Sequence, residues 1–530
     1  MGKLGLLVSL MICCFLVRTE GYRILGIFPF CSKSHQMMFD ALSKGLARRG
    51  HQLEIVTCFP PKKPIANFTV LMNVENSQTP LVNSWTVDLA LNVGSDTLKA
   101  IIEVYGNDLC HLMGREEMQR IIKNPPKDPP YDLIIVEAFG ANCFIGLGAL
   151  FNVPVIFAST TIEMPWINRA IGNPSNLAYF PSFFADFRHP LTFWERVKNV
   201  VHDAIIMYRY NAMAGDVQTQ LMRKYLHPDI PHIRELEKKV TLALINSFYT
   251  LSGVRGTTTG LIEVGGLHVE DNDTELSKDL KKWLDESKHG VVYFTLGSMV
   301  NIETMPDDVI KGLYNSFEKI APIKVLMKIA NKDKLLPGQP KNLITSSWIP
   351  QVQVLAHKNT KLFITHGGLM STQESLYHAV PLIGIPLFGD QHLNLKHYEG
   401  KGMAVILNFN NINEQTMSAA LDKVLNDPSY RNAAEKQSAR FRDRPMSAME
   451  TATFWVEYII RNGPDAVKSP AADLTWWQIE LLDVYGFLIA SAIILIYIGI
   501  FMFKLIFNII SGMLSTNNHQ NNLTNGKKRD

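Results

Sequence analysis

The sequence predicts an α/β protein with two doubly wound, Rossmann-like domains that face each other across a cleft, followed by one C-terminal transmembrane helix. Three observations predict this architecture. The first half of the chain repeats a strand–helix–strand pattern, the second half carries a further series of short apolar runs, and one long uncharged apolar stretch lies near the end. Strands joined by helices form parallel sheets, and such sheets bind ligands outside the carboxyl ends of their strands.

The composition is typical of folded domains. Of the 530 residues, 47% are hydrophobic and 19% are charged, which excludes a disordered chain and a protein that crosses a membrane many times. The formal net charge is +3, and no dense basic stripe precedes the extreme C-terminus. We therefore expect no nucleic-acid partner.

Residues 1–21 have the layout of a secretory signal peptide. Lys3 precedes the apolar run LGLLVSLMICCFLV, and the small residues Thr19 and Gly21 follow at offsets suited to cleavage. The alternative is a membrane-spanning helix. Because the run is short for a bilayer, we predict that the segment is removed.

The first domain is predicted over residues 22–268. Its strands are expected at 22–30, 51–59, 131–139 and 153–160, with helical segments between the members of each pair. This is the βαβ pattern of a parallel sheet. The segment 164–194 is rich in Phe, Tyr, Trp and Pro, and we expect it to contribute both to a wall of the cleft and to the core.

A polar linker over 269–284 leads to the second domain, which is predicted over 285–445. Its apolar runs read VVYFTLGS, KVLMKI, LITSSWIP, KLFITHGG and VPLIGIP, and helical or loop segments separate them. They predict a second doubly wound sheet. A closing helix and a membrane-proximal segment are expected over 446–484.

The stretch 485–503 is predicted to span a membrane. Its 19 residues carry no charge, and as a helix they would be about 29 Å long, which matches a hydrocarbon core of about 30 Å. With a signal peptide at the other end, the body would be luminal and the tail, 504–530, cytosolic. The tail's basic residues agree with the positive-inside rule. Its ending, KKRD, resembles the dilysine retrieval signal of membrane proteins of the endoplasmic reticulum.

Cysteines and glycosylation sequons complete the picture of the luminal part. The cysteines that remain after removal of the signal peptide are Cys31, Cys58, Cys110 and Cys143. They are scattered and form no CxxC pair, so we expect buried thiols rather than a disulfide scaffold or a metal site. Sequons at Asn67 and Asn272 are expected to accept glycan.

The segment 347–391 concentrates residues that suit a phosphorylated ligand. A strand, KLFIT, turns through His366 and Gly368 into a helix. Free N–H groups and the dipole at a helix N-terminus favour phosphate. His366 and the hydroxyls of Ser371 and Thr372 can donate to the same anion.

Other residues of this segment suit the remaining parts of a nucleotide sugar. Glu374 can accept hydrogen bonds from ribose hydroxyls, Trp348 offers a flat face to a base, and Gln351 can bond to the base edge. Asp390 and Gln391 follow another strand and suit sugar hydroxyls. Each residue alone is weak evidence, because a lone Trp is usually core and a terminal Asp-Gln pair is usually solvated.

The combination resembles the signature of the UDP-glycosyltransferase family, and its wording is most similar to the insect members. The pattern is met in order by Trp348, Pro350, Gln351, His366, Gly368, Ser371, Thr372, Glu374, Pro386, Asp390 and Gln391. The resemblance covers nearly the whole chain. It implies the GT-B fold, which consists of two facing Rossmann-like domains.

The resemblance also implies roles in binding the UDP-sugar donor. Trp348 would stack on uracil and Gln351 would bond to it, while Glu374 would hold the ribose. The pyrophosphate would be held by His366, Gly368, Ser371, Thr372 and Ser298. Asp390 and Gln391 would hold the transferred sugar. Met370 departs from the family pattern, because many relatives have Asn there.

On the acceptor side, the resemblance implies that His35 is the catalytic base. It would take the proton from the acceptor hydroxyl as the oxygen attacks the anomeric carbon, and its unperturbed pKa of about 6.5 suits that task. Glu137 would orient the imidazole and stabilise its charged form. Relatives usually have Asp there. Asp132 begins the same strand, at the wrong end for the cleft, and is the poorer candidate.

Direct attack on an α-linked UDP-sugar would invert the anomeric centre and give a β-glycoside. We expect no metal and no other cofactor, because helix termini and His366 can balance the diphosphate; the UDP-sugar itself is a co-substrate. The chain is expected to contact a small lipophilic acceptor and the membrane. Whether it forms a homo- or hetero-oligomer is left open by the sequence.

Several functions stay in competition at this point. The leading one is transfer of a hexose, glucose by the insect resemblance, to small lipophilic compounds of the kind met in detoxification. Transfer to a ceramide-type glycolipid acceptor and a catalytically inactive UDP-sugar-binding relative are the alternatives. A dinucleotide-dependent oxidoreductase would carry G-x-G-x-x-G after its first strand, and FPFCSKSH has no such run.

Overall fold

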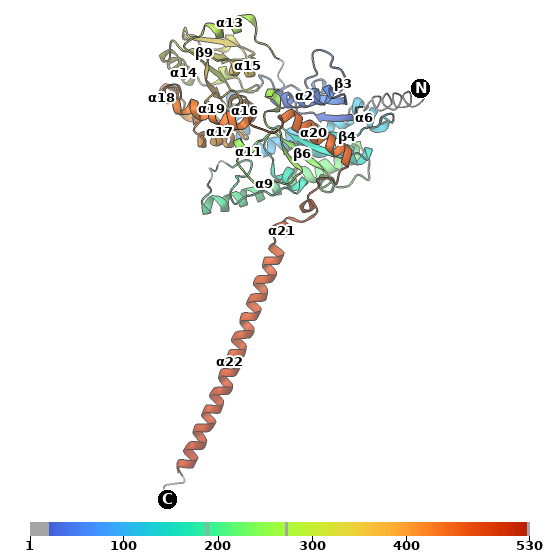
Figure 1. Ribbon diagram of the computed structural model, residues 1–530, viewed down its shortest axis with the longest axis vertical. Helices are drawn as coiled ribbons and strands as arrows, with labels where there is room; N and C mark the ends of the chain where they lie inside the picture. Colours follow the sequence, from blue (N-terminus) through green and yellow to red (C-terminus); the bar gives the residue numbers. More distant parts are fainter. Residues whose placement is uncertain (1–20, 186, 188–189, 271–273, 527–530) are drawn as a thin grey trace, which may run out of the picture. The chain divides into compact units, whose positions relative to one another are not determined.

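The computed structural model describes residues 21–185, 187, 190–270 and 274–526, with side chains as far as residue 516. Nearly all of the predicted signal peptide lies outside the described residues, and so does the predicted glycosylation site Asn272. The chain divides into two compact units, one ending at Ala472 and one beginning at Asp473 (Figure 1).

The first unit contains a seven-stranded sheet in which every neighbouring pair of strands is parallel. The strand order is β3-β2-β1-β4-β5-β6-β7. The strands are β1 (Arg23–Phe28), β2 (Gln52–Thr57), β3 (Phe68–Asn73), β4 (Leu133–Glu137), β5 (Val155–Ser159), β6 (Leu242–Ile245) and β7 (Leu261–Glu263). Leu25 and Ile27 enter one hydrophobic cluster, while Ile24 and Phe28 enter another. Both faces of the sheet are therefore buried, as is usual for parallel sheets.

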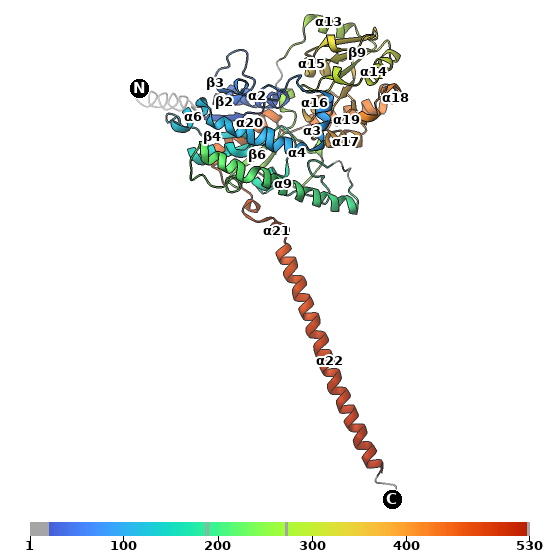
Figure 2. The same cartoon turned by 180° about the vertical axis from the view of Figure 1, so that it is seen from behind.

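Helices cover this sheet, which with them forms the N-terminal lobe (Figures 1 and 2). The helices in this part of the chain are α2 (Lys33–Arg48), α3 (Val87–Ser95), α4 (Thr97–Lys99), α5 (Asp108–Cys110), α6 (Glu116–Lys123), α7 (Gly146–Phe151), α8 (Pro165–Ile171), α9 (Phe193–Tyr225), α10 (Ile233–Glu237), α11 (Tyr249–Ser252) and α12 (Leu267–Glu270), with the π-helix η2 (Ala100–Asn107) and the short turns η1 (Val74–Asn76), η3 (His111–Gly114) and η4 (Asn142–Ile145). Among them, α3 packs into the core of the C-terminal lobe rather than on this sheet. The longest, α9, begins with a capping box between Thr192 and Glu195, which satisfies free N–H groups of its first turn.

A second, six-stranded parallel sheet has the order β10-β9-β8-β11-β12-β13. Its strands are β8 (Val291–Thr295), β9 (Lys324–Lys328), β10 (Leu343–Ser346), β11 (Thr360–Thr365), β12 (Leu382–Gly384) and β13 (Ala404–Ile406). The helices that follow α12 are α13 (Lys278–Glu286), α14 (Asp307–Lys319), α15 (Gln351–Ala356), α16 (Leu369–Tyr377), α17 (Gln391–Gly400), α18 (Glu414–Asn426), α19 (Pro428–Arg442) and α20 (Ala448–Asn462), with turns η5 (Ile302–Thr304), η6 (Lys332–Lys334), η7 (Phe409–Asn411) and η8 (Pro470–Asp473). The prediction of two doubly wound sheets is confirmed.

Two segments cross between the lobes. Trp85, Val87 and Ala90 lie in the hydrophobic core of the C-terminal lobe, and the backbone N–H of Trp85 donates to Met299 O over 3.0 Å. In the other direction, α20 packs on α2 of the N-terminal lobe. Both segments join the two lobes through buried contacts. These contacts hold the carboxyl ends of the two sheets in fixed positions on either side of the space between the lobes.

The expectation of free buried thiols is wrong. Cys31 is bonded to Cys58 and Cys110 to Cys143, with Cα–Cα distances of 5.1 and 6.0 Å. Cys31 follows β1 and Cys58 follows β2, and these adjacent parallel strands end at the same edge of the sheet. Their separation of 27 residues along the chain hides this proximity in the sequence. Stable disulfides are typical of proteins in oxidising compartments.

The predicted glycan acceptor Asn67 is exposed in the turn before β3. Its backbone has a φ of 61°, a left-handed conformation that Asn tolerates better than most residues. Glycosylation of this site stays a prediction.

The second unit holds α21 (Trp476–Ile479) and α22 (Leu482–Gly526). Residues 482–516 of α22 are long and apolar enough to cross a membrane, with a hydropathy of 2.5. This candidate span includes the predicted segment 485–503 and extends beyond it at both ends. Its large apolar side chains are exposed, as expected of a helix that faces lipid.

Candidate active site

A cavity lies between the two sheets of the first unit and is lined by residues of both lobes. The N-terminal lobe contributes residues that follow β1, β4 and β5, and the C-terminal lobe contributes residues that follow β8, β10, β11 and β12, together with the last residue of β9. These are carboxyl ends of strands, as the sequence predicts. Of the residues predicted for donor binding and catalysis, those that line the cavity are His35, Ser298, Trp348, Gln351, His366, Gly368, Ser371, Glu374, Asp390 and Gln391.

His35 lines the cavity and contacts the buried carboxylate of Glu137, which is not itself among the lining residues. His35 is in the first turn of α2, and Glu137 is the buried last residue of β4. His35 Nδ1 lies 2.7 Å from Glu137 Oε1 and 2.9 Å from the hydroxyl of Thr160. Because Nδ1 is engaged on this side, Nε2 is the nitrogen that can accept a proton from a ligand.

The additional methylene of Glu137, relative to Asp, is accommodated by the local backbone. Its second carboxylate oxygen, Oε2, lies 3.4 Å from the backbone N–H of Phe30. The rings of Phe30 and Phe139 pack edgewise against the imidazole of His35, with centroids 4.7 and 4.8 Å away. Asp132 instead accepts a hydrogen bond from the backbone N–H of Arg23 at the start of β1, away from His35.

The residues predicted for the nucleoside lie together in the C-terminal lobe. Trp348 is at the rim of the cavity with 48% of its surface exposed. The Gln351 amide donates to the hydroxyl of Ser371 over 2.9 Å and to Glu374 Oε2 over 2.6 Å. Glu374 Oε1 lies 3.2 Å from Nε2 of His268. This polar cluster offers both donors and acceptors to a base and a ribose.

The residues predicted for the pyrophosphate lie at the start of α16. Gly367 has a φ of 90°, which favours glycine, and a Cβ there would lie 2.5 Å from Leu395 Cγ. Gly368 follows as the N-cap of α16. Burial and the nearby charge of Lys328 lower the pKa of His366 to about 4. A neutral His366 can donate one hydrogen bond to a phosphate oxygen but carries no charge.

Lys328 supplies the positive charge that His366 lacks, and the sequence interpretation missed it. Lys328 ends β9, lines the cavity and donates to Asn83 Oδ1 over 2.5 Å. Burial lowers its pKa to about 8, so the ammonium form predominates at neutral pH. Its position, at the end of the apolar run KVLM, is the signal that could have revealed it, because ligands bind at strand ends.

Thr372 is the predicted donor-binding residue that does not line the cavity. Its side chain is fully buried, and its hydroxyl donates to the backbone oxygen of Leu369 over 3.0 Å. Met370, by contrast, lines the cavity, and its sulfur lies 3.0 Å from the amide nitrogen of Asn246. An Asn at position 370 could make a polar contact to the UDP-sugar. Met370 instead contacts Asn246 of the other lobe.

Asp390 and Gln391, the residues predicted to hold the transferred sugar, line the cavity at the start of α17. Asp390 Oδ2 accepts from the Asn394 amide over 2.8 Å. Burial raises the pKa of Asp390, while that bond and the charge of His35 in the opposite lobe act against the rise. Gln391 Oε1 accepts from the backbone N–H groups of Leu387 and Phe388, which leaves its amide nitrogen to reach a ligand.

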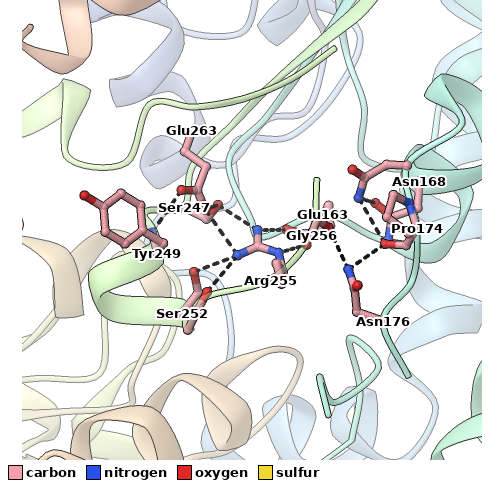
Figure 3. A network of polar contacts seen from close by, with 12 residues as sticks. Glu163, Asn168, Pro174, Asn176, Ser247, Tyr249, Ser252, Arg255, Gly256 and Glu263 are labelled. Atoms are coloured by element: carbon pink, nitrogen blue, oxygen red, sulfur yellow. Dashed lines mark hydrogen bonds and ion pairs between the residues drawn. The ribbon is translucent and has the colours of Figure 1, made fainter. Parts of the chain in front are cut away.

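A buried ion pair holds the loop that follows β5 and carries Thr160. The guanidinium of Arg255 donates to both carboxylate oxygens of Glu163, over 2.5 and 2.7 Å. Figure 3 shows this guanidinium at the centre of a network that also includes Glu263 and Ser247. The Arg255 and Glu163 side chains are only 2% and 3% exposed. This network, which the sequence interpretation missed, fixes the backbone beside the His35–Glu137 pair.

Comparison with known proteins agrees with this geometry. The model of the family described as "UDP-glucoronosyl and UDP-glucosyl transferase" matches residues 72–515. UDP-glycosyltransferase UGT5 of Dactylopius coccus is 34% identical over 494 residues, which cover 90% of this chain and 91% of that protein. The 2-hydroxyacylsphingosine 1-beta-galactosyltransferase of Mus musculus is 28% identical, over 95% of this chain and 94% of that protein.

Solved structures show the same fold. Phytolacca americana UGT2, solved with UDP-2fluoro-glucose and pterostilbene, superposes with a TM-score of 0.56 at 16% identity, over 83% of this chain and all of that one. The glycotransferase of kitacinnamycin superposes with a TM-score of 0.53. The fold is therefore GT-B. With a family match over most of its length, the chain belongs to the UDP-glucuronosyl and UDP-glucosyl transferase family and is a UDP-glycosyltransferase.

Proposed function

We propose that the protein transfers a hexose, glucose in the first instance, from a UDP-sugar to a hydroxyl group of a small lipophilic acceptor, with inversion to a β-glycoside. The observation that carries this proposal is that His35, held 2.7 Å from Glu137, lines a cavity whose opposite wall includes the start of α16. A base and an anion-binding site then face the same space.

In the proposed reaction, Nε2 of His35 takes the proton from the acceptor hydroxyl. The oxygen attacks the anomeric carbon while the bond from that carbon to the UDP oxygen breaks. Glu137 keeps the imidazole oriented and stabilises the imidazolium that forms. Lys328, the N–H groups at the start of α16 and a hydrogen bond from His366 balance the charge of the departing UDP. Such base catalysis typically contributes about 10²- to 10⁴-fold.

An apolar half of the cavity supports a lipophilic acceptor. Beside His35, the lining includes the side chains of Phe30, Ile101, Tyr105, Phe139 and Phe183. Apolar pockets with few polar groups select hydrophobic ligands and orient them by those groups. Among the described residues of the aromatic segment 164–194, Phe183 lines the cavity.

We further propose that transfer needs no metal or other cofactor, because Lys328 and the helix N-terminus supply the electrostatic stabilisation. Turnover in the presence of EDTA should equal turnover with added Mg²⁺. A loss of activity that Mg²⁺ or Mn²⁺ restores would contradict this part of the proposal.

We propose the membrane of the endoplasmic reticulum as the location, with the two lobes in the lumen. The candidate span at 482–516, the two disulfides and the basic end of the tail support it. Glycan on Asn67 that endoglycosidase H removes would be the expected biochemical mark.

The deciding experiment measures UDP release from a panel of UDP-sugars with phenolic and steroid acceptors, for the wild type and for His35→Ala. We expect turnover with UDP-glucose, and a loss of at least about 10²-fold in the variant. Proton NMR of the product should show a β-linkage. Equal turnover by both proteins would remove His35 from the mechanism.

A second candidate, transfer to a ceramide-type acceptor, is favoured by the similarity to the mouse 2-hydroxyacylsphingosine 1-beta-galactosyltransferase. The same assay distinguishes the two functions when a 2-hydroxyacylsphingosine is offered with UDP-galactose and with UDP-glucose. Higher kcat/KM for that lipid than for every small phenol or steroid would favour the second candidate.

A further inference from the structure

The first half of α9 presents a continuous apolar face to the outside of the molecule. The residues that form it are Phe193, Trp194, Val197, Val200, Val201, Ile205 and Tyr208, with exposed fractions between 38% and 75%. Their spacing of three and four residues places them on one side of the helix over about 24 Å. We call this set the outer stripe of α9. In both views, α9 runs along the edge of the first unit (Figures 1 and 2).

The opposite face of α9 is fixed against the lobe, so the outer stripe cannot turn inward. Asn199, Ile206 and Tyr210 are buried. The Asn199 amide donates to the backbone oxygens of Leu177 and Phe180, and its oxygen accepts from the N–H of Ser182. These bonds set the rotation of the helix.

We propose that the outer stripe of α9 lies in the interfacial layer of the bilayer that holds α22. The proposal rests on the proposed membrane anchorage. An amphipathic helix with one wide apolar face binds in the plane of a membrane surface, and an exposed apolar patch of this size marks an interaction site. Trp194 and Tyr208, which are 69% and 75% exposed, are residue types that concentrate at membrane interfaces.

The charges beside the outer stripe favour a lipid surface over a second copy of the chain. Arg196 lies along one border of the stripe and Lys198 along the other, whereas Glu195 and Asp203 lie towards the buried side. Cations at the border of an apolar face attract anionic headgroups. Two copies that packed stripe against stripe would bring these cations together without acidic partners from the stripe.

The connection to the candidate span favours the same occupant. Residues 473–481 join the first unit to the helix that begins at Leu482, and nine residues reach at most about 30 Å. If α22 spans a bilayer, this short connection keeps the first unit within reach of the surface of that bilayer. The loop that Asn199 holds also leads to Phe183, a residue of the acceptor side of the cavity.

The test uses the full chain in nanodiscs of phosphatidylcholine with about one fifth phosphatidylserine. Because the described cysteines are in disulfides, a single introduced cysteine can carry a bimane label. Val201→Cys probes the outer stripe, Gln220→Cys probes an exposed polar site of the same helix, and Ile498→Cys probes the span. Quenching by nitroxide-labelled lipid and by aqueous iodide is measured for each.

We expect the label at 201 to be quenched by nitroxide lipid and to be at least about fivefold less sensitive to iodide than the label at 220. Adding Val197→Asp, at an exposed position, should abolish the lipid quenching at 201 and leave turnover of a water-soluble acceptor unchanged. Equal iodide access at 201 and 220 would overturn the inference. Cross-linking between two copies of the chain at position 201 would also overturn it, because a second copy would then be what shields the label from iodide. If the label at 498 is quenched by lipid and the label at 201 is not, the inference alone fails. If neither is quenched, the proposed anchor fails with it.

Discussion

At the scale of single residues, the length of the Glu137 side chain is matched to the position of His35. The Glu137 carboxylate lies 2.7 Å from His35 Nδ1. The side chain of Asp is one methylene shorter, so it could reach the imidazole only if the backbone moved. We expect Glu137→Asp to lower kcat about tenfold, and Glu137→Gln, which also removes the charge, to lower it about 10²- to 10⁴-fold. Steady-state kinetics check this order. Asp132→Asn is the control and should leave kcat unchanged. If Asp at position 137 supports full activity, the pair is not matched in length.

Lys328 leads to a prediction on pH. Because burial lowers its pKa to about 8, the ammonium that would pair with the diphosphate is lost as pH rises through 8. The KM for the UDP-sugar should therefore rise above pH 8 in the wild type. Lys328→Arg keeps its charge at all these pH values, so its KM should stay flat. Lys328→Met should show a KM raised about 10-fold or more even at pH 7. A wild-type KM that is constant from pH 7 to 9.5 would exclude this role for Lys328.

At the scale of elements, the pair of Arg255 and Glu163 fastens the loop after β5 to the segment after α11 (Figure 3). Removing one partner of a buried pair leaves an uncompensated charge and costs about 3–5 kcal/mol. Arg255→Met should therefore lower the melting temperature strongly, and the double variant with Glu163→Gln should recover much of the loss. Thermal unfolding of the four proteins forms a double-mutant cycle. Additive effects would show that the two side chains are not coupled.

The elements also show what a sequence reveals. The strands β1, β2, β4, β5 and β8 to β12 were predicted because each is a short apolar run that ends where polar or glycine residues begin, as KLFIT does before His366. The strands β3, β6, β7 and β13 were not predicted. The proposed base and most of the proposed donor residues could be named because they follow such strands and match the family's motif. Contacts between distant segments were not. The disulfides, the crossing of Trp85 into the other lobe and the Arg255 network depend on the packing of the chain in three dimensions, and no local pattern encodes them.

At the scale of the whole molecule, a buried histidine whose charge depends on pH lies where the two lobes meet. His397 of α17 lies beside Ser247 and Leu251 of the N-terminal lobe, and its Nε2 is buried with no hydrogen-bond partner among the described residues. Burial, with smaller contributions from Lys401 and Arg255, lowers the pKa of His397 to about 4. The folded protein therefore keeps this imidazole neutral in mildly acidic solution.

An unfolded His397 takes up a proton below a pH of about 6.5, whereas the folded one does so only near 4, so acid favours the unfolded state. The free energy of unfolding should fall between pH 6.5 and 4, with a contribution of about 3 kcal/mol from this residue. His397→Gln cannot titrate, so its melting temperature should decline less over that range than that of the wild type. His227→Gln, at an exposed histidine, is the matched control and should decline as the wild type does. If the wild type and His397→Gln decline in parallel, protonation at the contact between the lobes is not what destabilises the protein in acid.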